Sequence, residues 1–124
     1  MAQVLIADSD QAHTDLVEIL LSLDHHEVHT LREGRAALEF LRNHTPDLII
    51  LDIQLPDISG IEVCARVKKV SRLRNVPVMI LTGVRDRTLL EQALLASADD
   101  VVPKPLEGKD FRAMVANLLS PRAA

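Results

Sequence analysis

Short apolar runs alternate along this chain with longer stretches of helical periodicity, and this alternation constrains the fold more than any other feature. The short runs are rich in Val, Ile and Leu and lie at residues 4–7, 27–31, 48–51, 78–81 and 101–102. After each run, apolar residues recur at helical spacing, within residues 16–23, 37–41, 61–67, 89–94 and 111–118. Such alternation is typical of a parallel sheet covered by helices on both faces. We therefore expect a doubly wound α/β fold with a five-stranded parallel sheet.

The length and composition suit one domain of this kind. The chain has 124 residues, of which 48% are hydrophobic, and this is enough for one core around one sheet. We expect a domain over residues 1–120, followed by a tail or the start of a linker at residues 121–124. The single cysteine, Cys64, lies among apolar residues, which indicates a buried thiol in a reducing compartment.

Charge and aromatic content bear on the classes of partner. The formal net charge is −4, and the chain has two Phe, no Tyr and no Trp, which argues against both duplex DNA and stacking on single strands. One basic run, formed by Lys68, Lys69, Arg72 and Arg74, reads as the solvated end of a helix and a loop. Since no leader and no run long enough to span a membrane is present, we expect a cytoplasmic protein without direct nucleic-acid or membrane partners.

Polar residues follow the apolar runs at the points where the expected strands end. The first run leads into Asp8, Ser9 and Asp10, and the third into Asp52. Thr82 follows the fourth run, and Lys104 follows the fifth after a short gap. Because ligands of open parallel sheets bind beyond the carboxyl ends of the strands, these residues are candidates for one site.

Phosphoryl transfer is the chemistry that uses this set of side chains. A divalent cation and a fixed positive group neutralise charge on the phosphoryl oxygens, and carboxylates are ligands that Mg²⁺ prefers. One of these carboxylates can also be the nucleophile, forming an aspartyl phosphate. Lys104 then supplies the positive charge and Thr82 a hydrogen bond. Asp10 is equally compatible with a simpler role as the cap of the next helix.

One long motif and three short ones carry a resemblance to a known family. Residues 46–60 read Pro-Asp-Leu-Ile-Ile-Leu-Asp-Ile-Gln-Leu-Pro-Asp-Ile-Ser-Gly, and Leu81-Thr82-Gly83, Ser97-Ala98-Asp99-Asp100 and Lys104-Pro105 accompany them. Together they resemble the receiver domains of two-component response regulators, with the chemotaxis type as the single-domain example, over residues 2–119. The resemblance implies a flavodoxin-like (βα)5 fold with strand order 2-1-3-4-5.

The resemblance also implies a role for each site residue. Asp52 would accept a phosphoryl group from a phosphohistidine on a sensor histidine kinase or phosphotransfer protein. Asp8, Asp52 and the backbone carbonyl of Gln54 would hold Mg²⁺, Thr82 would bond the phosphoryl group, and Lys104 would pair with it across a cis Lys104–Pro105 bond. Such a domain is a signalling phosphoacceptor that catalyses only its own phosphorylation and dephosphorylation, and it acts on a downstream protein target.

Two positions depart from the family pattern. Ser9 stands at the usual acidic ligand position, so either Asp10 replaces that ligand or metal affinity is lower, and we expect weakened but surviving Mg²⁺ binding. Val101 stands where the family usually has a Tyr or Phe whose rotation reports phosphorylation. Valine has no ring to turn. We therefore expect the signal to leave by shifts of loops and helices near the fourth helix and fifth strand, within residues 84–110.

Three alternatives stay open at this point. The chain could be a receiver-like docking module that takes no phosphate. The sequence Asp8-Ser9-Asp10 also resembles the DxD motif of haloacid dehalogenase-type phosphohydrolases, with Asp8 as nucleophile, although Ala12 fits that motif poorly. A third feature is a group of histidines that either binds a metal or forms a polar loop leading into an edge strand. Its members are His25, His26 and His29.

Overall fold

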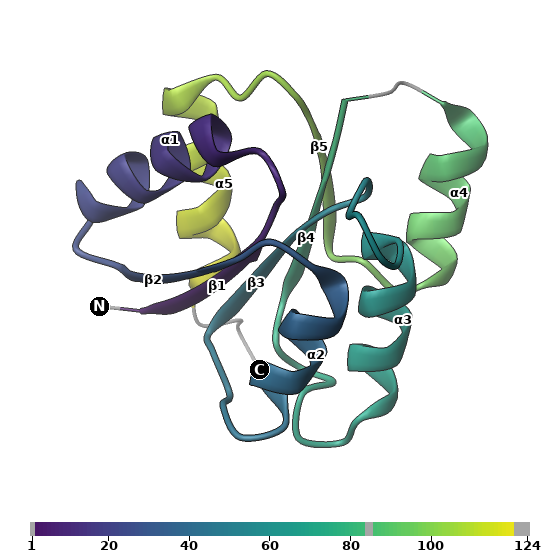
Figure 1. Ribbon diagram of the computed structural model, residues 1–124. Coiled ribbons are helices and arrows are strands. Elements are labelled where there is room, and N and C mark those ends of the chain that lie inside the picture. Colours follow the sequence, from purple (N-terminus) through teal and green to yellow (C-terminus); the bar gives the residue numbers. More distant parts are fainter. Residues whose placement is uncertain (1, 84–85, 121–124) are drawn as a thin grey trace.

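The computed structural model describes residues 2–83 and 86–120 and shows a parallel five-stranded sheet with helices on both faces (Figure 1). The strand order is β2-β1-β3-β4-β5, which confirms the predicted fold class and order. In chain order the elements are β1 (Gln3–Ala7), α1 (Gln11–Ser22), β2 (Glu27–Leu31), α2 (Gly34–Leu41), β3 (Leu48–Asp52), α3 (Gly60–Lys69), β4 (Val78–Thr82), α4 (Arg87–Leu95), β5 (Asp100–Pro103) and α5 (Gly108–Leu119).

The third and fourth strands each continue one residue beyond their apolar runs into a polar residue. β3 ends at Asp52 and β4 ends at Thr82, so both polar residues are the last residues of their strands. In the parallel register Asp52 pairs with Leu81, and Thr82 pairs with Pro103. The strand pairing therefore delivers the polar residues to one edge of the sheet.

The alternation of side chains along the strands divides the core into two halves. Val4 and Ile6 of β1 point to the face that α1 and α5 cover, where Phe111 is the largest buried side chain. Leu5 and Ala7 point to the opposite face, which α2, α3 and α4 cover. Burial of both faces explains why the central strands read as continuous apolar runs.

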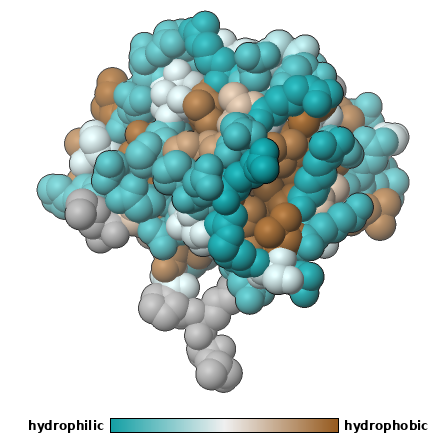
Figure 2. Space-filling model, turned by 60° about the horizontal axis from the view of Figure 1, so that its bottom comes forward, coloured by the Kyte–Doolittle hydropathy of each residue, from teal (hydrophilic) through white to brown (hydrophobic). Residues whose placement is uncertain are grey.

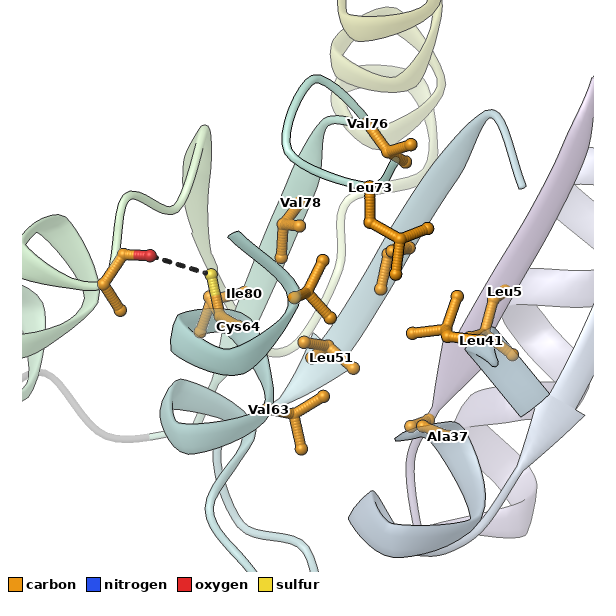
Figure 3. Close-up of a cluster of buried hydrophobic side chains, with 14 of the residues drawn as sticks. Leu5, Ala37, Leu41, Leu51, Val63, Cys64, Leu73, Val76, Val78 and Ile80 are labelled. Carbon is orange, nitrogen blue, oxygen red and sulfur yellow. Dashed lines mark hydrogen bonds between the residues drawn. The ribbon is translucent and has the colours of Figure 1, made fainter. Parts of the chain in front are cut away.

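Cys64 lies in the second half of the core, as predicted from its apolar neighbours (Figure 3). Its Sγ donates a weak hydrogen bond to the carbonyl oxygen of Ala96, 3.4 Å away. Burial raises the pKa of the thiol to about 11. A thiol held in this way is a packing residue and a poor nucleophile.

The helices begin at side-chain caps where the sequence provides them. Asp10, Ser59, Asp86 and Glu107 each accept a hydrogen bond from a backbone N–H in the first turn of α1, α3, α4 and α5 respectively. Such caps satisfy N–H groups that have no partner within the helix. Asp10 thus caps α1, which was one of the two roles expected for it; the other was that of a metal ligand.

The interpretation of the basic run as solvated is wrong for Lys68. Its side chain is only 12% exposed, and its Nζ donates to the carbonyl oxygens of Arg74 and Val76 and to Asp99 Oδ2, the shortest of these contacts being 2.8 Å. The loop from residue 70 to residue 77 folds back over the end of α3, so the lysine lies beneath it. Lys69, one residue on, is exposed as predicted.

Within the described part of the chain, no helix has both the length and the apolar character needed to cross a membrane. The tail expected at residues 121–124 lies outside the described residues.

Candidate functional site

Two buried carboxylates and one lysine meet at the carboxyl edge of the sheet. Asp8 follows β1 and is 1% exposed, and Asp52 ends β3 and is 6% exposed. The Nζ of Lys104, which follows β5, lies 2.9 Å from Asp8 Oδ2 and 2.9 Å from Asp52 Oδ2. Three segments far apart in the sequence thus place two acids on one shared ammonium group, with a net charge of −1 when all three are ionised.

The loop after β3 fixes the Asp52 carboxylate. The backbone N–H of Gln54 donates to Asp52 Oδ1 at 3.1 Å, and the N–H of Gly60 donates to the carbonyl oxygen of Ile53 at 3.0 Å. A Cβ at Gly60 would lie 2.1 Å from the Asp52 carbonyl oxygen, far inside contact distance. Only glycine lets α3 begin this close to the acceptor strand.

Asp57 in the same loop holds the neighbouring helix in place. Its carboxylate accepts hydrogen bonds from the backbone N–H groups of Gly34 and Arg35, both at 2.8 Å, at the start of α2. Glu33, the residue that precedes α2, makes no side-chain capping bond of its own. Asp57 is therefore a cap supplied by a distant segment, and it ties the loop of the site to the helix layer.

The two carboxylates have pKa values displaced in opposite directions. Burial tends to raise the pKa of Asp8, but contacts with His13, the backbone N–H of Asp10 and Lys104 outweigh it and hold the pKa well below its usual range. At Asp52 burial prevails over the bonds from Lys104 and Gln54, and the pKa is raised. Burial tends to lower the pKa of Lys104, yet its bonds to Asp52 and Asp8 raise it. Lys104 therefore stays charged. Of the two carboxylates, Asp52 is the one whose ionised form burial makes less favourable.

His13 is a member of the site that the sequence reasoning missed. Its Nδ1 lies 2.6 Å from Asp8 Oδ2, and its side chain is 9% exposed. A signal was available in the spacing, because His13 stands four and eight residues before the buried Val17 and Leu21 of α1 and therefore shares their face. The histidine thus contacts the same oxygen of Asp8 as Lys104 does.

The remaining polar residues of the first loop lie outside this cluster. Ser9 and Asp10 are both exposed, and the Asp10 side chain caps α1. Among residues 2–83 and 86–120, no group of three or more His, Cys, Asp and Glu side chains has the arrangement of a metal site. The carboxylates that do lie together at this edge are Asp8 and Asp52. Two carboxylates suit Mg²⁺, which keeps several waters.

Thr82 borders the site on the β4 side. Its carbonyl oxygen accepts a hydrogen bond from the Lys104 N–H at 2.8 Å, and the Lys104–Pro105 peptide bond is cis, as expected. Thr82 also lines a pocket of about 340 Å³ together with Leu89, Leu90 and Val101. The small side chain of Val101 leaves this space beside α4.

The three clustered histidines belong to a different region. His26 Nδ1 accepts from the backbone N–H of Ala2 at 3.3 Å, and His29 Nε2 lies 3.1 Å from Gln3 Oε1. His25 has a positive φ of 64° in the turn before β2. β2 is an edge strand of the sheet, which confirms the interpretation as a polar turn leading into an edge strand.

The chain is similar in sequence to the members of one known family. The family of the response regulator receiver domain matches residues 4–116. Transcriptional regulatory protein AfsQ1 of Streptomyces coelicolor is 35% identical over 119 residues, which are 96% of this chain and 52% of that protein. The chain thus spans about half the length of this relative.

Two solved structures show the same fold. Chemotaxis response regulator CheY4 of Vibrio cholerae has a TM-score of 0.90 at 25% identity, over 96% of this chain and 99% of that one. The Mn²⁺-bound form of response regulator Rcp1 has a TM-score of 0.81 at 28% identity, over 95% and 91% of the two chains. These matches do not favour the phosphohydrolase alternative, in which Asp8 was the nucleophile.

Proposed function

The chain belongs to the response regulator receiver domain family, and from this membership we propose that it is phosphorylated on Asp52 by a phosphohistidine of a histidine kinase or phosphotransfer protein. The observation that carries the proposal is the shared lysine: Lys104 Nζ lies 2.9 Å from both Asp52 Oδ2 and Asp8 Oδ2 at the carboxyl edge of the sheet. The receiver fold is that of a signalling domain, and it is not that of a conventional enzyme. We assign the domain to residues 1–120.

In the proposed reaction a carboxylate oxygen of Asp52 attacks the phosphorus atom of the donor. The phosphorus–oxygen bond forms as the phosphorus–nitrogen bond of the phosphohistidine breaks, and the donor imidazole keeps the electron pair. Negative charge then spreads over the phosphoryl oxygens, and the ammonium group of Lys104 is already in place to neutralise part of it. The hydroxyl of Thr82 at the neighbouring strand end supplies a hydrogen bond to one of these oxygens.

A divalent cation completes this site in the proposal. Asp8, Asp52 and the carbonyl of Gln54 would hold it, and when bound it would neutralise charge on the phosphoryl group. Mg²⁺ suits the all-oxygen donors, and the Mn²⁺-bound Rcp1 structure supports a divalent ion in this fold. Because Ser9 is neutral and Asp10 caps α1, we expect weaker binding than two adjacent acids would give.

The signal is proposed to pass to a downstream protein target in the cytoplasm, without direct contact of this domain with nucleic acid. Thr82 and Val101 line the pocket beside α4, so a bond from Thr82 to the phosphoryl group would move a side chain that borders this pocket. We therefore expect the output surface to include α4 and β5. Residues 84 and 85 belong to the segment expected to transmit the signal, residues 84–110, and lie outside the described residues.

Intact-mass measurement with acetyl phosphate tests the proposal. With Mg²⁺ present, the protein should gain the mass of one phosphoryl group, and Asp52→Asn should gain none. Without a divalent cation the gain should be lost or strongly reduced, because the charge on the phosphoryl oxygens is then poorly neutralised. Amide shifts of residues 86–110, recorded on the same samples, report the output.

Asp57→Asn is the matched control, since Asp57 is a carboxylate of the same loop that contacts neither Lys104 nor Asp8 in the described hydrogen bonds. It should still take up the label if its fold is intact by circular dichroism. Labelling that persists in Asp52→Asn would contradict the assignment. A parent protein that never takes up phosphate from acetyl phosphate or from a kinase would favour the docking-module alternative.

A further inference from the structure

A groove between α2 and α3 combines an apolar floor with a rim of arginines. It measures about 480 Å³, and its floor includes Leu38, Val67 and Val70. Figure 2 shows it in the right half of the view as a hydrophobic strip between two hydrophilic ridges. Its lining residues come from α2, the last turn of α3 and the loop that follows, and none of them belongs to the Asp8, Asp52 and Lys104 cluster.

The rim of this groove is positive although the whole chain is negative. The groove is lined by four arginines, Arg35, Arg42, Arg66 and Arg72, and by one acid, Glu39. Glu62 pairs with Arg66 at 3.0 Å beside it, which leaves an excess of two positive charges although the formal net charge of the chain is −4. The Arg72 guanidinium is fixed by hydrogen bonds to the carbonyl oxygens of Leu41 and His44 and to the Thr45 hydroxyl. An occupant that suits this groove is apolar along one side and acidic beside it.

Helix α1 of the same chain has this character. Leu16, Ile19 and Leu23 are 40%, 60% and 55% exposed, and their spacing of three and four residues places them in one strip. Asp15 and Glu18 are exposed beside the strip. Residues 1–31 contain no Lys or Arg, so Asp15 and Glu18 have no permanently charged cation within this segment. Such a helix offers the anchors at i, i+3 and i+7 that helix-in-groove contacts use.

The two surfaces cannot meet within one molecule. α1 covers one face of the sheet, and α2 and α3 cover the other (Figure 1). We propose that α1 of one copy docks into the α2–α3 groove of a second copy, in a head-to-tail contact that does not require phosphorylation. A heterologous contact of this kind leaves one free α1 and one free groove at the ends of each pair, so further copies can add.

The contact is small, so the proposed association is weak. One helix in one groove buries less surface than a stable interface, and we expect dissociation constants of roughly 0.1–1 mM. Its exposed charges also make it sensitive to salt. Sedimentation equilibrium of the full chain from about 10 μM to about 1 mM should show a rising mean mass at low salt and a monomer at high salt.

Charge-reversal variants test which surfaces are in contact. Arg42→Glu alters the groove, and Glu18→Arg alters α1; each should weaken association about tenfold. Arg87→Glu and Glu91→Arg are the matched controls, because Arg87 and Glu91 form an exposed pair on α4 comparable to Arg42 and Glu39. Ile19→Ser removes an exposed anchor without changing charge and should also weaken association. The controls should associate like the parent.

Mixing the two altered proteins gives the decisive result. The intact α1 of Arg42→Glu can enter the intact groove of Glu18→Arg, and the two reversed charges are complementary to each other, so the mixture should regain the association that each variant alone has lost. A parent that stays monomeric at every concentration at low salt would overturn the proposal. It would equally be overturned if the groove variant weakened association while neither α1 variant did, or if the mixture failed to pair.

Discussion

At the scale of single residues, Ser9 is the main departure of this site from the family pattern. A neutral hydroxyl stands there in place of the second of two adjacent carboxylates. Ser9 is exposed and directly follows Asp8, which shares the ammonium group of Lys104 with Asp52. Asp10 does not compensate in this structure, because its side chain caps α1. One further carboxylate at position 9 would therefore raise the negative charge available to a cation.

We predict that Ser9→Asp binds Mg²⁺ roughly tenfold more tightly than the parent, because affinity for hard cations rises with the number of ligand charges. Isothermal titration calorimetry measures the difference directly. Ser9→Asn is the matched control, since it adds a similar volume without a charge, and it should bind like the parent. Equal affinities for the parent and Ser9→Asp would show that position 9 does not limit the metal site.

His13 belongs to no sequence motif, yet it lowers the pKa of a carboxylate in the site. It contacts Asp8 at 2.6 Å from the first turn of α1, on the face that also buries Val17. Together with Lys104 and the backbone N–H of Asp10, it accounts for the low pKa of a carboxylate that burial alone would raise. The ionised state of Asp8 is therefore a property of three surrounding segments.

At the scale of elements, Lys68 joins the end of α3 to the two strands that follow it. Its Nζ donates to two carbonyl oxygens of the loop and to Asp99 Oδ2, and Asp99 Oδ2 also accepts from the backbone N–H of Val78 at 2.7 Å. Asp99 immediately precedes β5, and Val78 begins β4. The ammonium group of Lys68 thus links the C-terminal end of α3 to the N-terminal ends of β4 and β5.

We predict that Lys68→Met lowers the free energy of unfolding by about 1–2 kcal/mol, because the partly buried Val76 carbonyl and the Asp99 carboxylate lose their shared donor. Urea denaturation followed by far-UV circular dichroism suits this chain, which lacks Trp and Tyr. Lys69→Met, at the exposed neighbouring position, should change the value by no more than about 0.5 kcal/mol. Similar losses for the two variants would refute the structural role of Lys68.

At the scale of the whole molecule, the site acts on global stability through two carboxylates of opposite effect. The folded state lowers the pKa of Asp8 and raises that of Asp52 from their usual value near 3.8. Ionised Asp8 therefore contributes stability above pH 3.8 that is lost as the pH falls through its folded-state pKa. Ionised Asp52 opposes folding at neutral pH, and this cost disappears as the pH falls through its folded-state pKa towards the unfolded value.

We predict that Asp52→Asn raises the free energy of unfolding at pH 7 by on the order of 1 kcal/mol, as is common when a strained functional group is removed. This gain should shrink between pH 7 and pH 3, where the parent carboxyl becomes protonated. Asp8→Asn should instead lose about 2–3 kcal/mol at pH 7, because a satisfied buried charge is broken. Urea denaturation at both pH values measures the pair, and a destabilised Asp52→Asn at pH 7 would contradict the sign.

The sequence by itself determined the α/β class, the parallel sheet and the strand-end positions of Asp8, Asp52, Thr82 and Lys104. These follow from local patterns: continuous apolar runs occur where both faces of a strand are buried, and the carboxyl ends of parallel strands share an edge. The family motif around Asp52 added the strand order and the cis bond before Pro105. All of these features are encoded within short segments.

Only the tertiary structure decided which distant groups meet. It placed His13 against Asp8 and buried Lys68 beneath a loop. Asp57 caps the start of α2 from a distant segment. Leu16 and Ile19 are exposed, although their spacing suits a core face. Apolar spacing determines which face of a helix turns towards the sheet, but the width of the buried strip on that face depends on the neighbouring elements. The pKa values of Asp8 and Asp52 are equally nonlocal, because burial and bonds from three chain segments set the balance between them.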